Sequence, residues 1–208
     1  MAVSALLLES CRGVKPSGCR FALPLPGAFA ARLEALAARA PVPAFFANLD
    51  RPPRHHERLS LCACANGCAR PQVADLGLLA AREIAVRTDR CTGCGACVAA
   101  CPDGAFALRE CVAALDAARC LGCGRCLAVC PAEALTAGPV AFRVTLGGRL
   151  GRRPRLGLEL PVRFSPQATL AMVERCLRAH AALSRPGGRL ADILFPDGQP
   201  GLPAWIWA

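Results

Sequence analysis

Apolar and polar residues follow two different periods in the parts of the chain that flank its middle. Residues 28–40 place apolar side chains at helical spacing, with Phe29 and Leu33 on one face, and stop at Pro41. This pattern predicts an amphipathic helix. Residues 140–146 alternate large apolar side chains with small or polar ones and end at a glycine pair, which predicts a half-buried strand.

A second helix and further strands are predicted in the same flanking parts. Ser165 followed by Pro166 is typical of a helix start, and Leu170, Val173 and Leu177 then recur on one side. Strand-like runs cover residues 5–8, 58–61 and 78–86. Helices and strands on both sides of a central segment predict an α+β fold with an insertion.

Composition narrows the class of protein. The chain has 208 residues, of which 54% are hydrophobic and 19% charged, enough for a packed core in one or two domains. No apolar run approaches the length of a membrane helix, so no membrane span is expected. The first eight residues lack early positive charge and meet Glu9 at once, which is unlike a secretory signal. A reducing, cytoplasmic location is therefore expected.

The net charge of +10 raises the question of an anionic partner. Nucleic acid is not expected, because the arginines are scattered and few aromatic residues accompany them. The exception is one group next to glycines, formed by Arg149, Arg152, Arg153 and Arg155. A different anion is the expected partner of this group, with a biased base composition of the genome as the alternative explanation of the charge.

Fifteen cysteines are the strongest chemical signal in the composition. In a reducing compartment, metal or cluster ligation explains so many thiols better than disulfides do. The odd count also fits pairing badly. Cys111 and Cys176 lie outside the motifs described below and are expected to be small buried apolar residues. The three histidines show no partner spacing and are expected at the surface.

The middle of the chain contains one motif twice, as CTGCGACVAACP and CLGCGRCLAVCP. Each copy has the spacing C-x2-C-x2-C-x3-C-P, in which three thiolates bind one [4Fe–4S] cluster and the fourth binds the other cluster. The first predicted ligand set is Cys91, Cys94, Cys97 and Cys130, and the second is Cys120, Cys123, Cys126 and Cys101. A pair of zinc knuckles is the alternative, but three cysteines in so tight a turn do not suit tetrahedral zinc. The segment resembles bacterial-type dicluster ferredoxins, which act as electron relays.

A third cysteine-rich region precedes these repeats. LCACANGCARPQVADLGLLA is similar to the C-x3-C segment of siroheme-type sulfite and nitrite reductases, and Cys64 and Cys68 match that C-x3-C. The earlier pair of the family pattern corresponds to Cys11 and Cys19 in SCRGVKPSGCRFAL, with seven residues between them where the family has five. FRVTLGGRLGRRPRLGLEL resembles the GGKxGRxPxLG segment of the same family. A dicluster ferredoxin inserted between these parts is the arrangement of dissimilatory and anaerobic sulfite reductase subunits.

The resemblance implies a domain organisation and a third metal site. The expected fold is α+β, a siroheme/[4Fe–4S] reductase half-domain interrupted by a bacterial-type dicluster ferredoxin domain. The reductase-like parts are residues 1–85 and 138–208, and the ferredoxin domain is residues 86–137. A third [4Fe–4S] cluster, coupled to siroheme, is implied on Cys11, Cys19, Cys64 and Cys68, with Cys68 as the bridging thiolate.

The resemblance also gives the basic group a role. Siroheme carries carboxylates, and Arg149, Arg152, Arg153 and Arg155 are expected to pair with them. The alternative is a solvated basic loop. Cys62 is an additional thiol beside the C-x3-C, and its substitution for one of the ligands stays open. Lys15 is expected to be an exposed lysine, with a substrate-facing role as the alternative.

Two functions follow. In the first, the chain is a component of a siroheme-dependent sulfite reductase and passes electrons through two ferredoxin clusters to the siroheme-coupled cluster. In the second, it is a non-catalytic electron-transfer protein that has lost siroheme, or a nitrite reductase component. The family has another half upstream, so a partner subunit or an N-terminal half is expected to complete the siroheme pocket. An electron donor and sulfite or nitrite are the other expected partners, and no catalytic residue is assigned.

Overall fold

The computed structural model describes residues 6–40, 57–183, 188–195 and 202–207. The chain forms two compact units, one made of residues 1–80 and 142–208 and the other of residues 81–141. The predicted division had placed these boundaries after residues 85 and 137. The α+β class predicted from the sequence is confirmed, because both units combine helices with strands. Within the described residues, none of the helices has the length and apolar character needed to cross a membrane.

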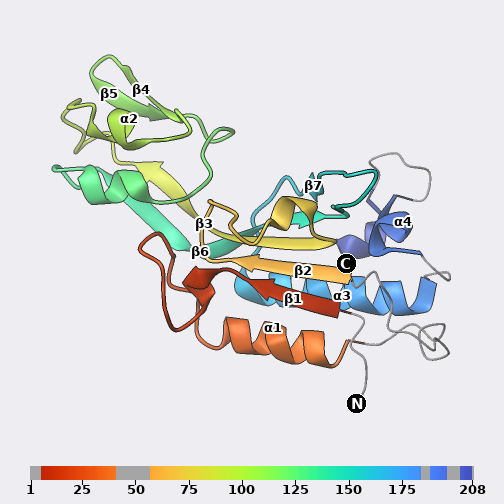
Figure 1. The fold of residues 1–208 in the computed structure, drawn as a ribbon. Helices are drawn as coiled ribbons and strands as arrows, with labels where there is room; N and C mark the ends of the chain where they lie inside the picture. Colours follow the sequence, from red (N-terminus) through yellow and green to blue (C-terminus); the bar gives the residue numbers. More distant parts are fainter. Residues whose placement is uncertain (1–5, 41–56, 184–187, 196–201, 208) are drawn as a thin grey trace. The chain divides into compact units, whose positions relative to one another are not determined.

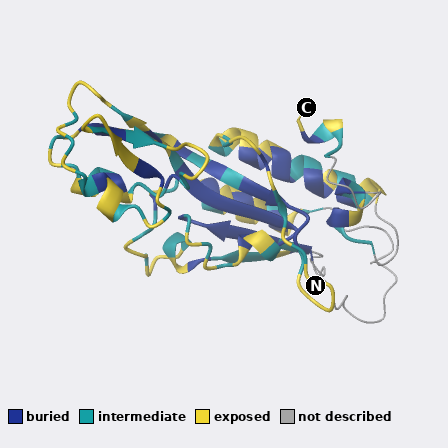
Figure 2. Cartoon of the chain, turned by 90° about the horizontal axis from the view of Figure 1, so that it is seen from above, coloured by how far each residue is buried: buried dark blue, intermediate teal, exposed yellow. Residues whose placement is uncertain are grey.

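The larger unit is built on a sheet whose strand order is β1-β2-β3-β6-β7 (Figure 1). The strands are β1 (Leu6–Ser10), β2 (Glu57–Cys62), β3 (Leu76–Val86), β6 (Leu135–Leu146) and β7 (Leu158–Glu159). Residues 81–86 of β3 and 135–141 of β6 belong to the smaller unit. The first three are parallel, and β6 pairs with β7 in the antiparallel sense. Parallel strands such as β2 and β3 are covered on both faces, and in β2 this burial includes the polar residues Glu57 and Ser60. Most residues of these two strands are buried, as Figure 2 shows along the sheet.

Helices α1 (Phe29–Ala38), α3 (Pro166–Leu183) and α4 (Leu190–Leu194) complete this unit. Helix α1 contacts β1 and α3, and its Phe29 ring stacks on Phe142 of β6 with centroids 4.2 Å apart. The two predicted helices are therefore confirmed. Ser165 caps α3, since its Oγ accepts the Ala168 amide at 3.2 Å, and the predicted apolar side of this helix is buried.

The smaller unit has an internal repeat that follows the two cysteine motifs. It contains α2 (Ala96–Ala100), the hairpin of β4 (Phe106–Arg109) and β5 (Val112–Leu115), and a 3-10 helix over Arg125–Val129. Gly95 and Gly124 precede the two short helices with φ of 76° and 75°, and Cys101 and Cys130 follow them with almost the same extended backbone. The repeat seen in the sequence is thus a repeat in backbone conformation.

Three expectations about single residues are settled by the structure. Cys176 is fully buried, as predicted. Cys111 was expected to be buried but is exposed, because it occupies the β4–β5 turn with a φ of 60° next to Glu110 at 50°. His180 was expected at the surface but is 4% exposed in α3. His55 and His56 lie outside the described residues.

Candidate functional site

The predicted first set of cluster ligands comes together in the smaller unit. Cys91, Cys94, Cys97 and Cys130 line a single pocket with Ala113, Ala134 and Leu135 among its walls. Three of these thiols come from the first motif and the fourth from the end of the second. Burial raises the pKa of the Cys97 thiol, and the neighbouring charges of Cys91 and Cys130 raise it further. Four thiols facing one space are the arrangement that a cubane cluster requires.

The predicted second set is also grouped. Burial raises the pKa of Cys126 to about 11, and the charges of Cys123, Cys120 and Cys101 add to the shift. These partners are the first two thiols of the second motif and the last thiol of the first. The core of this unit is accordingly formed around cysteines, with Ile84, Phe106 and Leu135 among the apolar residues that pack with them.

Backbone amides of the smaller unit point at several of these sulfurs. Ala113, Ala105 and Ala134 donate to the Sγ atoms of Cys91, Cys101 and Cys130, each at 3.3 Å. The hydrogen bonds from the amides of Ala113 and Gly93 lower the pKa of Cys91. An amide donor stabilises the thiolate form, which is the form that binds iron, and tunes the potential of a cluster.

Two glycines of the motifs are required by close packing. A Cβ on Gly93 would overlap the carbonyl oxygen of Cys111, and a Cβ on Gly122 would overlap that of Arg82. Both glycines also have φ near 70°, which other residues rarely adopt. The glycines therefore allow the cysteine turns to fold against neighbouring backbone.

The third cysteine group lies in the larger unit where β1 and β2 end. Cys11 and Cys64 are buried, whereas Cys19 and Cys68 are exposed. Burial raises the pKa of the Cys64 thiol, the amide of Asn66 lowers it, and the charges of Cys11, Cys68 and Cys19 raise it again. These interactions mean that the four thiols named by the family resemblance are neighbours in space.

Cys62 belongs to this group as a fifth thiol. It is fully buried and packs in one small apolar cluster with Cys11 and Ala63. Its Sγ accepts the amide of Ala69, and the Sγ of Cys11 accepts the amide of Ala63, both at 3.3 Å. Burial raises the pKa of Cys62 to about 12, with a further contribution from Cys11. The sequence identified Cys62 as a neighbour, and the structure shows that it is the least accessible thiol of the five.

Among the described residues, no three or more His, Cys, Asp or Glu side chains are grouped closely enough to hold a single metal ion. A cubane cluster makes a different demand, because each of its four thiolates binds a different iron atom. A cluster site is therefore recognised by four thiols that surround a shared space.

The four arginines expected to bind carboxylates do not have equivalent positions. Arg149 and Arg155 pair across a tight hairpin, in which Arg149 Nε donates to the carbonyl of Arg153 at 3.0 Å. Arg155 donates twice to the carbonyl of Gly147, at 3.2 and 2.9 Å. Its guanidinium also lies 5.1 Å from the ring centroid of Phe195. Arg155 is thus engaged in holding the hairpin.

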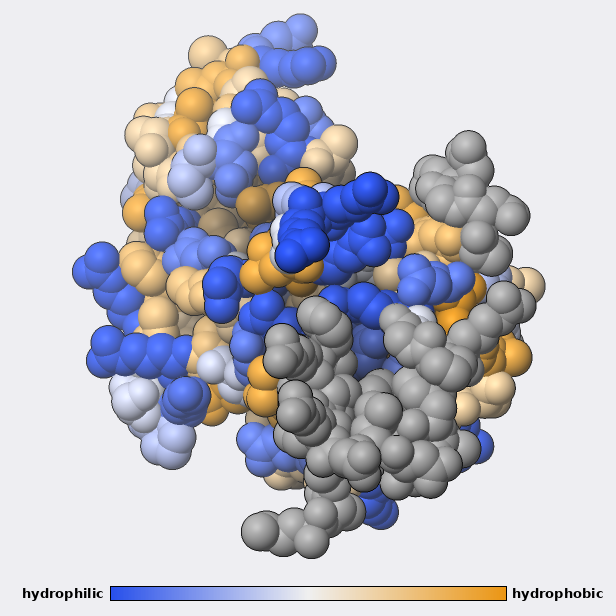
Figure 3. All heavy atoms as spheres, turned by 45° about the vertical axis from the view of Figure 1, so that its right-hand side comes forward, coloured by the Kyte–Doolittle hydropathy of each residue, from blue (hydrophilic) through white to orange (hydrophobic). Residues whose placement is uncertain are grey.

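The tip of this hairpin is exposed. Arg152 and Arg153 are exposed, as are Leu150 and Leu156 on either side of them. Figure 3 shows hydrophilic surface gathered next to hydrophobic surface on one face of the molecule. Charged and apolar side chains presented together suit a ligand that is itself both anionic and apolar.

The hairpin also contacts the segment that follows the C-x3-C. The Gly157 amide donates to the carbonyl of Gln72 at 2.7 Å, and Thr145 Oγ1 donates to the carbonyl of Pro71 at 2.9 Å. The side chain of Gln72 in turn packs against Gly67, between Cys64 and Cys68. Two family-like segments far apart in the sequence are therefore connected in the fold.

A cavity of about 760 Å³ lies beside the third cysteine group. Its lining includes Lys15, from between Cys11 and Cys19, and Arg70, which follows Cys68 by two residues. Arg70 has a φ of 54°, a conformation that is costly for a residue with a side chain. The sequence interpretation did not single out Arg70, although its place directly after the C-x3-C was a usable signal. Cofactor sites commonly have volumes in this range.

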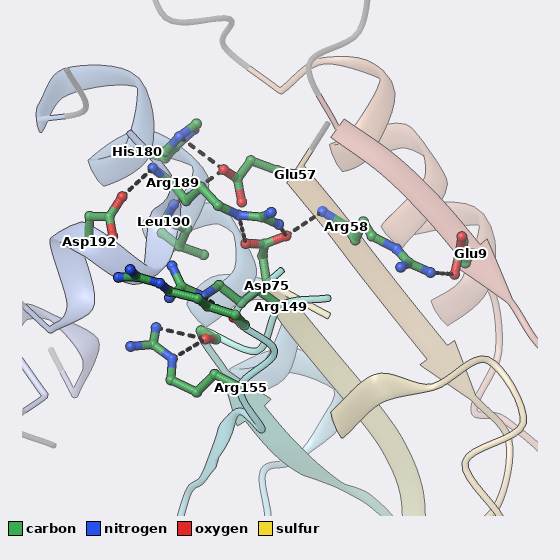
Figure 4. A network of polar contacts seen from close by, with 12 residues as sticks. Glu9, Glu57, Arg58, Asp75, Arg149, Arg155, His180, Arg189, Leu190 and Asp192 are labelled. Carbon is green, nitrogen blue, oxygen red and sulfur yellow. Dashed lines mark hydrogen bonds and ion pairs between the residues drawn. The ribbon is translucent and has the colours of Figure 1, made fainter. Parts of the chain in front are cut away.

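A buried network of charged residues lies at the other end of β2 (Figure 4). Arg189 donates through Nε and Nη2 to Asp75 at 3.1 and 2.5 Å, and the Arg58 amide donates to the same carboxylate at 2.9 Å. Glu57 Oε1 accepts the Leu190 amide at 3.3 Å and lies 3.4 Å from His180 Nε2. Burial, followed by the charge of Asp75, raises the pKa of Glu57 to about 9. Burial lowers the pKa of His180.

Comparison with known families agrees with the cysteine geometry. Residues 90–134 match the family described as "4Fe-4S dicluster domain". The chain is therefore an iron–sulfur protein with a ferredoxin domain, as predicted from the repeats.

Comparison with individual proteins identifies the wider group. The chain is 41% identical over 111 residues to one subunit of the anaerobic sulfite reductase of Salmonella typhimurium, in an alignment covering 51% of this chain and 33% of that protein. It is 35% identical over 60 residues to the coenzyme F420-dependent sulfite reductase of Methanocaldococcus jannaschii, covering 29% of this chain and 10% of that protein. Together with the dicluster domain, these matches show a sulfite reductase-related iron–sulfur protein and confirm the predicted resemblance.

A solved structure shows a similar fold. The crystal structure of dissimilatory sulfite reductase I superposes with a TM-score of 0.58 at 17% identity, covering 93% of this chain and 50% of that one. At this identity the likeness shows a shared fold. The chain matches only a third or less of the length of the curated relatives named above, 33% and 10%.

Proposed function

We propose that the chain is the electron-transfer component of a siroheme-dependent sulfite reductase, in which two ferredoxin clusters feed a third cluster coupled to siroheme. The observation that carries this proposal is the third group of thiols, Cys11, Cys19, Cys64 and Cys68, in a chain that already has a dicluster domain. A dicluster ferredoxin binds its two clusters with eight cysteines and does not need this third group.

In the proposed relay, the eight motif cysteines bind two [4Fe–4S] clusters in a crosswise manner. Cys91, Cys94, Cys97 and Cys130 hold the first, which is supported by the pocket that they line. Cys120, Cys123, Cys126 and Cys101 hold the second, which is supported by the mutual influence of their charges. The amides of Ala105, Ala113 and Ala134 stabilise the ligated sulfurs and so make reduction of the clusters easier.

The residues of the third group fit a cluster that shares a ligand with a neighbouring cofactor. Cys68 is exposed, so its sulfur is accessible from outside the group, whereas Cys11 and Cys64 are enclosed. The cavity offers space beside it, and its lining includes the cations Lys15 and Arg70 together with the carboxylates of Glu9 and Glu34. Siroheme, when bound, supplies the iron centre at which an oxyanion is reduced. The chain's own contribution is to hold the carboxylates with Arg149, Arg152 and Arg153 and to fix the hairpin through Arg155.

The rest of the proposed enzyme comes from outside the matched region. Since the chain matches 33% of the length of the Salmonella sulfite reductase protein, we infer a partner subunit or second half that completes the siroheme pocket. An electron donor reduces the relay, and sulfite is the proposed substrate.

The test is to purify the protein anaerobically and to record its iron, acid-labile sulfide and visible spectrum with and without added siroheme. We expect about twelve iron atoms per chain, for three cubanes. Cys68→Ser is expected to remove siroheme absorption and to lower iron to about eight atoms, while the exposed Cys111→Ser serves as the matched control. Equal iron content in both variants would refute the third cluster.

The second candidate is an electron-transfer protein without siroheme. It is favoured by the engagement of Arg155 with Gly147 and Phe195, which leaves fewer cations for carboxylates. This candidate predicts no siroheme absorption under any condition, with the eight relay cysteines unaffected. A nitrite reductase component is distinguished by testing nitrite against sulfite in the assembled complex.

A further inference from the structure

Cys11 and Cys62 lie opposite each other at the ends of two neighbouring parallel strands. The register pairs Ser10 of β1 with Leu61 of β2, so the next position pairs Cys11 with Cys62. The ladder continues through this position, because the Cys11 amide donates to the carbonyl of Leu61 at 2.9 Å. Neighbouring strands lie about 4.8 Å apart, and a disulfide needs Cα atoms roughly 4.4–6.8 Å apart. The backbone is therefore spaced for a cross-strand bond.

The side chains of Cys11 and Cys62 lie in the same buried environment. Opposite positions of a ladder point to the same face of a sheet. Cys11 and Cys62 accordingly pack in one buried cluster, against Val14, Ala22, Leu25 and Ala69. Amide hydrogen bonds from Ala63 and Ala69 fix the two sulfurs. No rearrangement of the strands is needed to bring these thiols together.

One thiol of the group is in excess. A cubane binds four thiolates, and the proposed third cluster uses Cys11, Cys19, Cys64 and Cys68. Cys62 is left without iron, yet it lies opposite a proposed ligand on a neighbouring strand. A thiol in that position is placed to compete with iron for Cys11.

We propose that Cys11 and Cys62 form a disulfide when the iron-free protein meets a peroxide, and that this bond withholds Cys11 from cluster assembly. The role of Cys11 rests on the proposed function. Hydrogen peroxide oxidises one thiol to a sulfenic acid and releases one water molecule. The second thiol attacks the sulfenic sulfur, the S–S bond forms and a second water leaves, so two thiols lose two electrons and peroxide is reduced to two waters. Exchange with a dithiol reduces this disulfide back to two thiols.

The exposed thiols give the oxidant access to this pair. Cys19 and Cys68 are exposed and meet peroxide first. A disulfide that includes one of these exposed thiols passes by thiol–disulfide exchange to the pair whose backbone spacing already fits. The oxidised protein then keeps a bond in its interior that dithiol reagents reach slowly.

The test begins with iron-free protein that is treated with hydrogen peroxide, alkylated and digested with trypsin. Cleavage after Arg12 and Arg58 separates the two strands, so a linked peptide containing Cys11 and Cys62 is diagnostic in mass spectrometry, with fragmentation to place the bond. We expect this peptide from the natural sequence and from Cys111→Ser, but not from Cys62→Ser or Cys62→Ala. Linkage of Cys64 to Cys68 in its place would overturn the proposal.

The second measurement is iron uptake after oxidation. Oxidised protein is expected to take up about four fewer iron atoms than reduced protein, one cubane's worth. The difference should disappear after dithiothreitol, and in both Cys62 variants it should be smaller by about four iron atoms. An unchanged difference in these variants would also overturn the proposal. The linked peptide is scored whether or not Cys68→Ser lowers iron, so this inference and the proposed function fail by different results.

Discussion

Replacement of Glu57 by glutamine is predicted to remove a dependence of stability on pH. Glu57 is 8% exposed at the start of β2 and lies among Asp75, His180 and Arg189. Its pKa is raised from 4.5 to about 9, first by burial and then by the charge of Asp75. The folded protein therefore keeps a proton on Glu57 that the unfolded chain releases. Glutamine carries no such proton, and its side-chain oxygen still accepts the Leu190 amide.

The sign and size follow from proton linkage. Between pH 4.5 and about 9 the folded state binds more protons than the unfolded state, so the free energy of unfolding falls as pH rises. A full proton corresponds to about 1.4 kcal/mol per pH unit. Coupling to Asp75 spreads the titration, and we expect about 1 kcal/mol per pH unit between pH 6 and 8. Above about pH 9 the contribution of Glu57 to stability is lost.

The assay is urea unfolding of the anaerobically purified protein at pH 6, 7 and 8, followed by tryptophan fluorescence. The quantity compared is the difference between the natural sequence and Glu57→Gln, because the titrations of groups that do not contact Glu57 cancel in that difference, whereas His180 lies 3.4 Å from Glu57 and contributes to it. Glu34→Gln changes an exposed glutamate of α1 and is the matched control. The reasoning is wrong if Glu57→Gln and Glu34→Gln keep the same pH slope.

Three further predictions concern single side chains. Asp75→Ala should lower the free energy of unfolding by about 3 kcal/mol, since it leaves the half-buried guanidinium of Arg189 without its buried carboxylate, and thermal unfolding would show a smaller loss if that ion pair were dispensable. Gly122→Ala should reduce iron incorporation because its Cβ overlaps neighbouring backbone, whereas Gly138→Ala, whose nearest contact is 3.7 Å, should not; equal iron contents would contradict this. Cys68→Ser should abolish siroheme coupling and leave the dicluster signals in electron paramagnetic resonance, and Cys62→Ser should be nearly silent in the iron-loaded protein. A dicluster lost with Cys68 would refute the independence of the two sites.

Features encoded within a short stretch of sequence were predicted well. The spacing of Cys91, Cys94 and Cys97 is set by one turn of backbone, so the pattern itself indicates a shared ligand space. The helix beginning at Pro166 was predicted from its cap and apolar period, which are also local. The fold class followed because these elements alternate on both sides of the repeats.

Features that depend on distant partners were missed or misjudged. Asp75 and Arg189 are 114 residues apart, and neither stands out in its own segment. His180 was placed at the surface because its partner Glu57 belongs to a strand far away in the sequence. Cys111 was misjudged for a different reason, since the composition of its neighbours does not reveal that the β4–β5 turn forces it outward.

The crosswise arrangement of the two motifs has a consequence for how the ferredoxin unit is made and lost. Cys130, from the end of the second motif, closes the pocket that begins with Cys91 in the first. Neither copy of the motif encloses its own four thiols, so one copy alone does not form a complete pocket. The first pocket can be completed only after Cys130, the last cysteine of the second motif, has been synthesised. Damage to Cys130 in the second motif likewise opens the pocket that the first motif lines.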